Sequence, residues 1–310
     1  MTRKPLLANA ASHDIVVVGQ SRELTIMTEP AALDHIVVTV GMHMDRAEKA
    51  FEELGFTMTP RGYHTLGSIN ALAMLQTDYI ELLGVPADQP NARPEIANAP
   101  LGLNGIVFKT KDANATFAHL QGLGVAGDPP KSFSRPVILA NGQMADAKFR
   151  TVTVAREVFP AGRLYFCEHL TPELVWRAEW QTHENRSVQI REVVIVTPYP
   201  DTLAGTMARI LHGVIMADAE KEVTSVLLGR GFKLTFQTMS QFQAKFGADA
   251  CGAGERTSML GAAIISSDLP ITFRNRISQD NQAYDCVTGD DEISIRIKAL
   301  DALLIFAPEA

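Results

Sequence analysis

LDHIVVTV, Leu33 to Val40, followed by DRAEKAFEELGF, Asp45 to Phe56, is the stretch of sequence that decides the fold. The first run is rich in β-branched residues and has the length of a strand. The second has apolar residues at helical spacing and reaches Gly55 where a helix end favours a left-handed residue. Two further strand-like runs follow, NALAMLQ (Asn70 to Gln76) and DYIELLGV (Asp78 to Val85). The stretch therefore predicts one unit of a strand, a helix and then strands.

Weaker copies of this unit recur three times along the chain. Each copy opens with a β-branched strand-like run and continues into a helix-like stretch and further strands. The opening pairs are Leu103 to Thr110 with Asp112 to Val125, Ile190 to Thr197 with Asp201 to Gly213, and Leu260 to Asp268 with Leu269 to Ile277. Since one such unit cannot close its own sheet, the repeats predict an α+β fold of four βαβββ modules paired into curved sheets. The alternative is a generic α+β domain in which similar strand and helix pairs recur by chance.

The repeats also suggest how the chain is divided. Residues 1–30 are expected to form an N-terminal arm, because regular patterning begins only near Leu33. The first paired-module domain is expected over 31–180 and a second, degenerate one over 188–310. The polar stretch from Gln181 to Ser187 is the expected boundary between them.

Composition limits the classes of function. The 310 residues are 46% hydrophobic and 20% charged, with a formal net charge of -7. Basic residues form no stripe or tail, so we expect neither nucleic acid nor an anionic membrane surface as a partner. The three cysteines, Cys167, Cys251 and Cys286, lack the spacing of a metal knuckle or a redox motif and favour a reducing compartment. No run approaches the length of a membrane span, and the cytoplasm is the expected location.

Two residues of the first unit are candidate metal ligands. His35 is the third residue of a strand that otherwise consists mainly of apolar residues, where a lone histidine is more often a packed core residue than a ligand. Glu81 lies within YIELLG, and a carboxylate with apolar strand neighbours is costly to bury without a partner. A divalent metal would offset that cost, because imidazole and carboxylate are common ligands of Zn, Fe, Mn and Ni.

The first unit resembles the glyoxalase-like branch of the vicinal-oxygen-chelate superfamily. The resemblance rests on LDHIVV, RGYHTLGSINALAML and DYIELLGV, in which His64, Gly67 and Asn70 match a histidine, glycine and asparagine signature. FCEHLTPELVW, residues 166–176, is similar to the last strand and exit loop of that family's second module. The resemblance implies the glyoxalase and extradiol dioxygenase-like fold. It also implies a divalent metal (Zn, Ni, Mn or Fe), with His35 and Glu81 at the ligand positions of the first module.

The second module departs from the family's pattern, which leaves the third ligand open. Gly105 stands where a first-strand ligand would be. On the last strand, Glu168 and His169 are neighbours that face opposite sides of a regular strand. His169 is the favoured ligand and would complete a set of two histidines and one carboxylate, whereas Glu168 would be a ligand that can also move a proton.

Other residues of these stretches are candidates for proton transfer or substrate binding. His64 and Glu168 are the candidate acid–base residues, although His64 reads equally well as a loop histidine. Asn70, Tyr79 and Glu173 are the candidate substrate-binding residues, each with a packing or capping alternative.

These observations lead to three functional hypotheses. The first is a lyase or isomerase of glyoxalase type that acts on a small molecule with vicinal oxygens through a metal-stabilised enolate. The second is an extradiol-type ring-cleaving dioxygenase with Fe(II) at His35, Glu81 and His169, and the third is a metal-free small-molecule-binding protein. A small-molecule substrate and a monomer or homodimer are expected in each case.

Overall fold

The computed structural model describes residues 29–139, 141–218, 223–247, 256–269, 275, 277, 282–289 and 291–309. The predicted N-terminal arm, apart from residues 29 and 30, and most of the helix-like stretch at 269–277 lie outside this part of the chain. Among the residues described, no helix is long and apolar enough to cross a membrane.

The first half of the chain forms two modules. The first consists of β1 (Leu33–Gly41), α1 (Met44–Glu53), β2 (Gly62–Tyr63), β3 (Ile69–Met74) and β4 (Tyr79–Gly84). After α2 (Pro94–Ala97), the second consists of β5 (Gly102–Lys109), α3 (Ala113–Gly122), β6 (Lys131–Ile138), β7 (Met144–Thr153) and β8 (Arg163–His169). Two short 3-10 helices, η1 (Pro172–Leu174) and η2 (Ala178–Trp180), lead out of this half. Gly55 has the left-handed φ of +77° that the end of α1 requires.

The second half repeats the plan. Its third module comprises β9 (Ser187–Val196), α4 (Pro200–Leu211), β10 (Val214–Asp218), β11 (Val223–Leu227) and β12 (Lys233–Gln237). The described strands of the fourth are β13 (Met259–Ser267), β14 (Tyr284–Thr288), β15 (Ile293–Ile297) and β16 (Ala302–Ala307). An additional helix, α5 (Met239–Phe246), lies between β12 and β13 and was not predicted.

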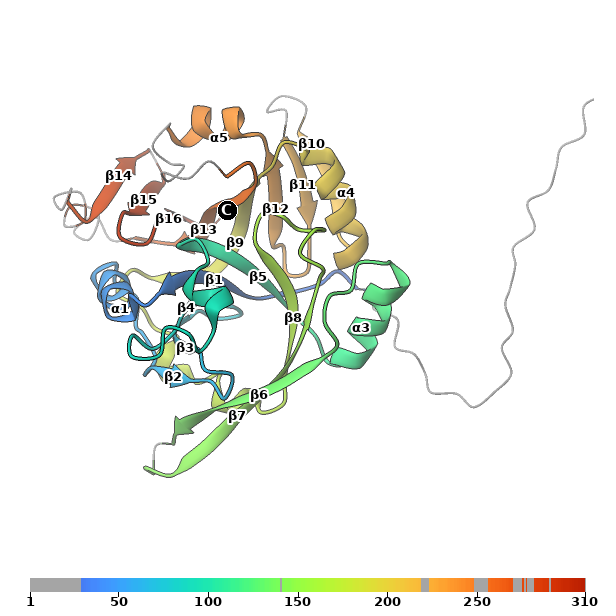
Figure 1. The fold of residues 1–310 in the computed structure, drawn as a ribbon. Coiled ribbons are helices and arrows are strands. Elements are labelled where there is room, and N and C mark those ends of the chain that lie inside the picture. Colours follow the sequence, from blue (N-terminus) through green and yellow to red (C-terminus); the bar gives the residue numbers. More distant parts are fainter. Residues whose placement is uncertain are drawn as a thin grey trace, which may run out of the picture.

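The strands form two eight-stranded sheets of the same topology (Figure 1). The first has the order β2-β3-β4-β1-β5-β8-β7-β6 and the second the order β10-β11-β12-β9-β13-β16-β15-β14. In each sheet the opening strands of two modules pair antiparallel at the centre, β1 with β5 and β9 with β13. In the first sheet the two ends also meet, because Thr65 N, just after β2, donates to Ser134 O on β6 (2.9 Å). The predicted α+β fold of paired modules in curved sheets is thus confirmed.

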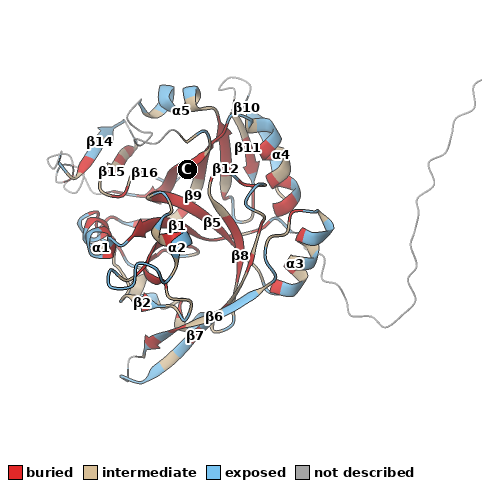
Figure 2. Ribbon diagram, viewed as in Figure 1, coloured by how far each residue is buried: buried red, intermediate tan, exposed pale blue. Residues whose placement is uncertain are grey.

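The two sheets share one hydrophobic core. One face of each sheet, together with α1, α3 and α4, contributes to a single buried cluster that includes Ile36 and Phe108 from the first sheet and Val193 and Phe306 from the second. The central strands are the buried part of the molecule, whereas much of the β6–β7 hairpin is exposed (Figure 2). The opposite face of each sheet lines a cup with its own smaller apolar cluster. The division into domains at residues 181–187 stays a prediction.

Candidate functional site

A cavity of about 580 Å³ lies in the cup of the first sheet. The residues that line it include six titratable side chains from β1, β4, β8 and the turn after β2, namely His35, His64, Tyr79, Glu81, Tyr165 and Cys167. Charged side chains such as Arg93, Arg156 and Glu157 line it as well. The sequence-predicted residues His35, His64, Tyr79 and Glu81 therefore line one cavity, and Tyr165 and Cys167 are additional members.

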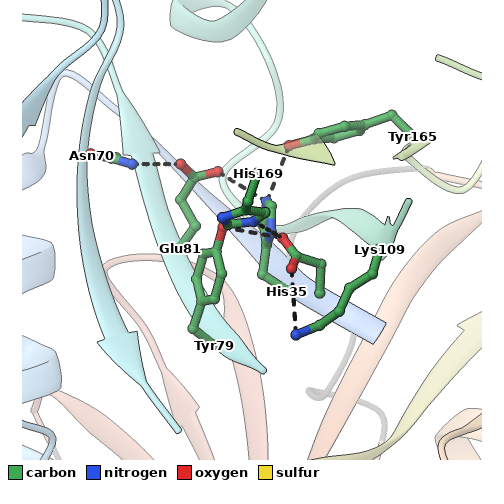
Figure 3. Close-up of polar contacts among 8 residues, drawn as sticks. His35, Asn70, Tyr79, Glu81, Lys109, Tyr165 and His169 are labelled. Carbon is green, nitrogen blue, oxygen red and sulfur yellow. Dashed lines mark hydrogen bonds and ion pairs between the residues drawn. The ribbon is translucent and has the colours of Figure 1, made fainter. Parts of the chain in front are cut away.

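His35 and Glu81 meet at this cavity although 46 positions separate them in the sequence. Parallel pairing of β1 with β4 places Val37 beside Glu81, and alternation directs His35 and Glu81 to the same face. His35 Nε2 lies 3.6 Å from Glu81 Oε2, and the opposite oxygen of Glu81 accepts a hydrogen bond from Asn70 Nδ2 (2.8 Å; Figure 3). Both side chains are more than nine-tenths buried. The carboxylate is thus held with one oxygen directed at the imidazole.

Asp34 holds the other nitrogen of His35. A register shift between Leu33 and His35 in the β1–β5 pairing interrupts the regular alternation at Asp34. As a result His35 Nδ1 donates to Asp34 Oδ2 (2.8 Å), even though neighbours on a regular strand face opposite sides. A proton on Nδ1 leaves the Nε2 lone pair directed toward Glu81 and the cavity, which is the arrangement that a histidine ligand requires.

The charges around His35 favour a positive charge at this position. Burial alone would lower the pKa of His35, but its contacts with Asp34 and Glu81 outweigh burial and raise that pKa. Burial would likewise raise the pKa of Glu81, whereas the hydrogen bond and charge of His35 lower it to about 2. Two buried carboxylates therefore flank one imidazole and attract either a proton or a metal cation.

His169 does not lie beside His35 Nε2 and Glu81, where a third ligand of the same ion would be. Its Nε2 donates to Asp34 Oδ2 (2.9 Å), which is the oxygen that already binds His35 Nδ1 (Figure 3). His169 thus lies on the Nδ1 side of His35, while Glu81 lies on the Nε2 side. Tyr79 stacks on His35 with ring centroids 4.4 Å apart and donates to the same Asp34 oxygen (3.3 Å). The triad of His35, Glu81 and His169 is not assembled around one point in this structure.

Glu168 lies on the other face of β8, away from the cavity. Its carboxylate accepts a hydrogen bond from Ala113 N at the start of α3 (3.1 Å) and lies 3.5 Å from Arg150 Nη1. A carboxylate at a helix N-terminus satisfies a free N–H group and interacts favourably with the helix dipole. The structure therefore gives Glu168 a capping position and not a position from which it could move a proton of a cavity-bound molecule.

The remaining predicted residues have different surroundings. His64 Nδ1 lies 2.9 Å from Ser68 Oγ at the cavity wall, and burial lowers the pKa of His64 to about 4. Asn70 is buried behind Glu81 and orients that carboxylate. Glu173 is exposed on η1 and is not among the residues that line the cavity.

The second module supplies a tyrosine to the site where the family pattern has a ligand. Val107 of β5 pairs with His35 on one side and with Tyr165 of β8 on the other. Tyr165 OH consequently lies 3.5 Å from His35 Nε2. At Gly105 an added Cβ would lie 3.0 Å from Val37, so there is little room there for a ligand side chain. Tyr165 could not be found from sequence, because its role depends on the register between β5 and β8.

Comparison with known proteins identifies the family. A model of the glyoxalase-like domain matches residues 33–211, which is more than half of the chain and begins at the first residue of β1. No curated protein matches the sequence.

Solved structures of similar fold cover nearly the whole chain. A hypothetical protein from Staphylococcus aureus superposes with a TM-score of 0.61 at 14% identity, over 89% of this chain and 99% of that one. A mutant of 4-hydroxymandelate synthase from Streptomyces coelicolor has a TM-score of 0.51 at 11% identity, over 91% of this chain and 94% of that one. A xylose isomerase-like TIM barrel/4-hydroxyphenylpyruvate dioxygenase fusion protein gives 0.53 at 12% identity, over 91% of this chain and 50% of that one. At such identities these likenesses show the fold alone, and the family match over residues 33–211 establishes that the chain belongs to the glyoxalase-like domain family of the vicinal-oxygen-chelate superfamily.

Proposed function

We propose that this protein is a metal-dependent enzyme of the lyase or isomerase type that acts on a small molecule with adjacent oxygen atoms. His35 and Glu81 would hold the divalent cation. One observation carries the proposal: His35 Nε2 and Glu81 Oε2 lie 3.6 Å apart at the cavity. Asp34 accepts a hydrogen bond from Nδ1 of the same ring, which leaves Nε2 free for a cation.

The residues present fit a divalent cation. Two donors bound about 2.1 Å from one ion, at neighbouring positions, lie roughly 3.0 to 3.6 Å apart, and the observed separation falls in that range. Tyr165 OH, 3.5 Å from His35 Nε2, is close enough to serve as a further oxygen donor. So few protein ligands would leave coordination positions open for the two oxygens of a substrate. A cation bound there would act as a Lewis acid toward a carbonyl oxygen.

The side chains around the pair would transfer a proton and shield the ligands from water. Burial lowers the pKa of His64, so its imidazole is neutral at pH 7 and carries a free lone pair. The same shift makes it a weak base, so proton removal from a carbon next to a carbonyl would depend on a bound cation that acidifies that carbon. Ser68 fixes the orientation of that ring through Nδ1. Tyr79 stacks on His35 and shields one side of the ligand ring from water. With Glu168 facing α3, His64 is the acid–base candidate that the cavity retains.

Ring-cleaving dioxygenase activity is the weaker alternative. Iron in that role would need a second histidine beside His35 and Glu81. His169, the histidine predicted for that place, binds Asp34 on the far side of the His35 ring. The corresponding register positions of the second module hold Gly105 and Tyr165.

Metal content tests the proposal. Elemental analysis of the untagged full chain should find a stoichiometric divalent metal, and the double variant His35→Ala, Glu81→Ala should lose that equivalent. The matched control is Glu192→Ala with Lys233→Ala, which removes a pair of polar residues from the cup of the second sheet and should retain the metal. If the native chain binds no metal after reconstitution, or if the double variant binds as much as the native chain, the proposed function is wrong. The identity of the metal that the double variant loses separates the two enzyme classes, because iron favours ring cleavage and zinc or nickel favours the lyase or isomerase.

A further inference from the structure

We propose that Asp34, Cys167 and His169 form a second cation site, separate from the His35 and Glu81 pair and suited to a thiophilic divalent ion such as Zn²⁺. One potential ligand atom from each residue lies within 4.8 Å of the others. Asp34 comes from β1 and the other two residues come from the end of β8, and Cys167 also lines the cavity.

The strand geometry explains why these residues converge. Cys167 and His169 are two positions apart on β8 and so face the same side of the sheet. The irregularity of β1 at Asp34 turns that carboxylate toward them. Asp34 has no exposed surface, Cys167 is 3% exposed, and the side chain of His169 is 9% exposed. A carboxylate, a thiol and an imidazole are thus gathered in one buried place.

Two buried atoms of this cluster have no hydrogen-bond partner among the described residues, namely Asp34 Oδ1 and His169 Nδ1. Because His169 Nε2 donates to Asp34, its Nδ1 carries a lone pair that no described donor satisfies. Leaving a buried polar atom unsatisfied is unfavourable. The Nδ1 lone pair points away from Asp34, because Nε2 faces that carboxylate, so a cation shared by the two residues would take the place of the Nε2 proton. It would also bind Asp34 Oδ1, whose nearest described cation is the Lys109 ammonium at 3.8 Å.

The donor set specifies the kind of ion. Sulfur, imidazole nitrogen and carboxylate oxygen are together typical of zinc, which takes four ligands and would have one position left for a molecule in the cavity. The thiol would bind as thiolate, because a bound divalent cation deprotonates a coordinating cysteine. Binding here requires modest closure of the three side chains, since zinc ligands lie about 2.0 to 2.3 Å from the metal.

Lys109 competes with a cation for this site. Its ammonium lies 3.8 Å from Asp34 Oδ1 (Figure 3). It also lies 4.0 Å from the centroid of the Trp176 ring. The Lys109 side chain is 35% exposed and can therefore move into solvent. Removing its charge should strengthen cation binding, an effect that a purely structural hydrogen-bond cluster would not show.

Cobalt(II) is a spectroscopic probe for the site, because a cysteine thiolate bound to cobalt gives a ligand-to-metal charge-transfer band in the near ultraviolet. Titration of the metal-free full chain with cobalt should produce this band. Cys167→Ser should abolish it, and Cys286→Ser, the matched control on β14, should retain it. Lys109→Met should tighten binding by roughly tenfold, as expected for removal of a unit charge near the ion. Circular dichroism and thermal unfolding of each variant would show that the fold is kept.

Glu81→Gln makes this test independent of the proposed function. It removes a ligand of the first site but none of the second, so the cobalt–thiolate band should persist. Absence of the band in the native chain, or its persistence in Cys167→Ser, would overturn the second site. Loss of the band in a folded Glu81→Gln variant would also overturn it, because a single site would then account for the metal. A failure of the first site alone would leave the band unchanged.

Discussion

The two sheets have the same topology but very different cups. Parallel pairing places His35 beside Tyr79 in the first sheet and Glu192 beside Lys233 in the second. Two residues further along β12, Thr235 stands at the position that Glu81 occupies on β4. The second cup thus keeps polar residues at corresponding places, but Glu192 is neutralised by Lys233 Nζ at 2.8 Å. A salt bridge takes the place of the histidine and carboxylate pair.

The two cups also differ in what fills them. In the second, α5 inserts Phe242, which is fully buried among apolar side chains that include Val196 and Met259. Gly261 makes room for it, since an added Cβ there would lie 2.5 Å from the Phe242 ring. The first cup holds a cavity of about 580 Å³ in the equivalent space. The comparison shows that the paired-module fold provides a cup in each sheet. The side chains inside determine whether that cup becomes a ligand cavity or a packed apolar core.

The largest effect that this comparison predicts is on stability. Phe242→Ala should lower the free energy of unfolding by about 3 to 4 kcal/mol, because it leaves a cavity in a closed apolar cup. Phe133→Ala, at the wall of the first cup, should cost only about 1 kcal/mol, since that ring already borders open space. Chemical denaturation of both variants measures the difference. Equal losses would mean that the two cups are packed alike.

Much of the fold could be predicted from sequence because strand and helix periodicity is local. The runs from Leu33 to Val40 and from Ile190 to Thr197 appear as strands in the structure. The elements that were not predicted have weak local patterns. β6 contains Pro136 and is largely exposed, and proline argues against a strand. α5 has a single buried residue, although the Thr238 and Gln241 capping box was a signal that could have revealed it.

The site was less predictable, because its decisive contacts are between strands. His35 and Glu81 were found from their own strands, and alternation correctly placed Glu168 and His169 on opposite faces. Asp34 was missed, because regular alternation directs it away from His35 and only the irregularity of β1 brings the two side chains together. The position of His169 next to Asp34 also depends on strand order, which one sequence does not reveal.

A smaller effect is expected where the two sheets join. Asp78 lies in the turn before β4, and its Oδ1 accepts a hydrogen bond from Ile190 N on β9 (2.9 Å). Burial raises the pKa of Asp78 from 3.8 to about 7. The folded chain therefore binds an extra proton between about pH 4 and 7, so the contribution of Asp78 to stability is complete below this window and is lost as the pH rises through 7.

Asp78→Asn should remove this pH dependence while keeping the acceptor for Ile190 N. The variant is expected to be more stable than the native chain by about 1 to 2 kcal/mol at pH 8, with a smaller difference at pH 5. Denaturation curves at the two pH values measure it, and Asp88→Asn, on an exposed loop, is the control. A constant difference at both pH values would show that Asp78 stays ionised in the folded chain.

The salt bridge of the second cup should contribute still less to the free energy of unfolding. Replacing Glu192 by Gln and Lys233 by Met together should change the free energy of unfolding by under about 1 kcal/mol, because Lys233 is 37% exposed and solvent screens the pair. The same double variant should leave metal binding unchanged. Denaturation and elemental analysis measure both quantities. A loss of metal would place a functional site in the second cup and contradict the contrast between the two.

The smallest effect concerns His64 in the wall of the first cup, where we expect no titration near neutral pH. Burial lowers the pKa of His64 to about 4; the nearby charge of Glu81 opposes the shift, and those of Arg135 and Arg93 add to it. Its imidazole signals in NMR should therefore stay constant from about pH 8 down to 5.5 and move only in more acidic solution. His64→Gln assigns these signals. A midpoint near 6.5 would mean that water fills this wall of the cup, and the first cup would then differ from the second by hydration as well as by its side chains.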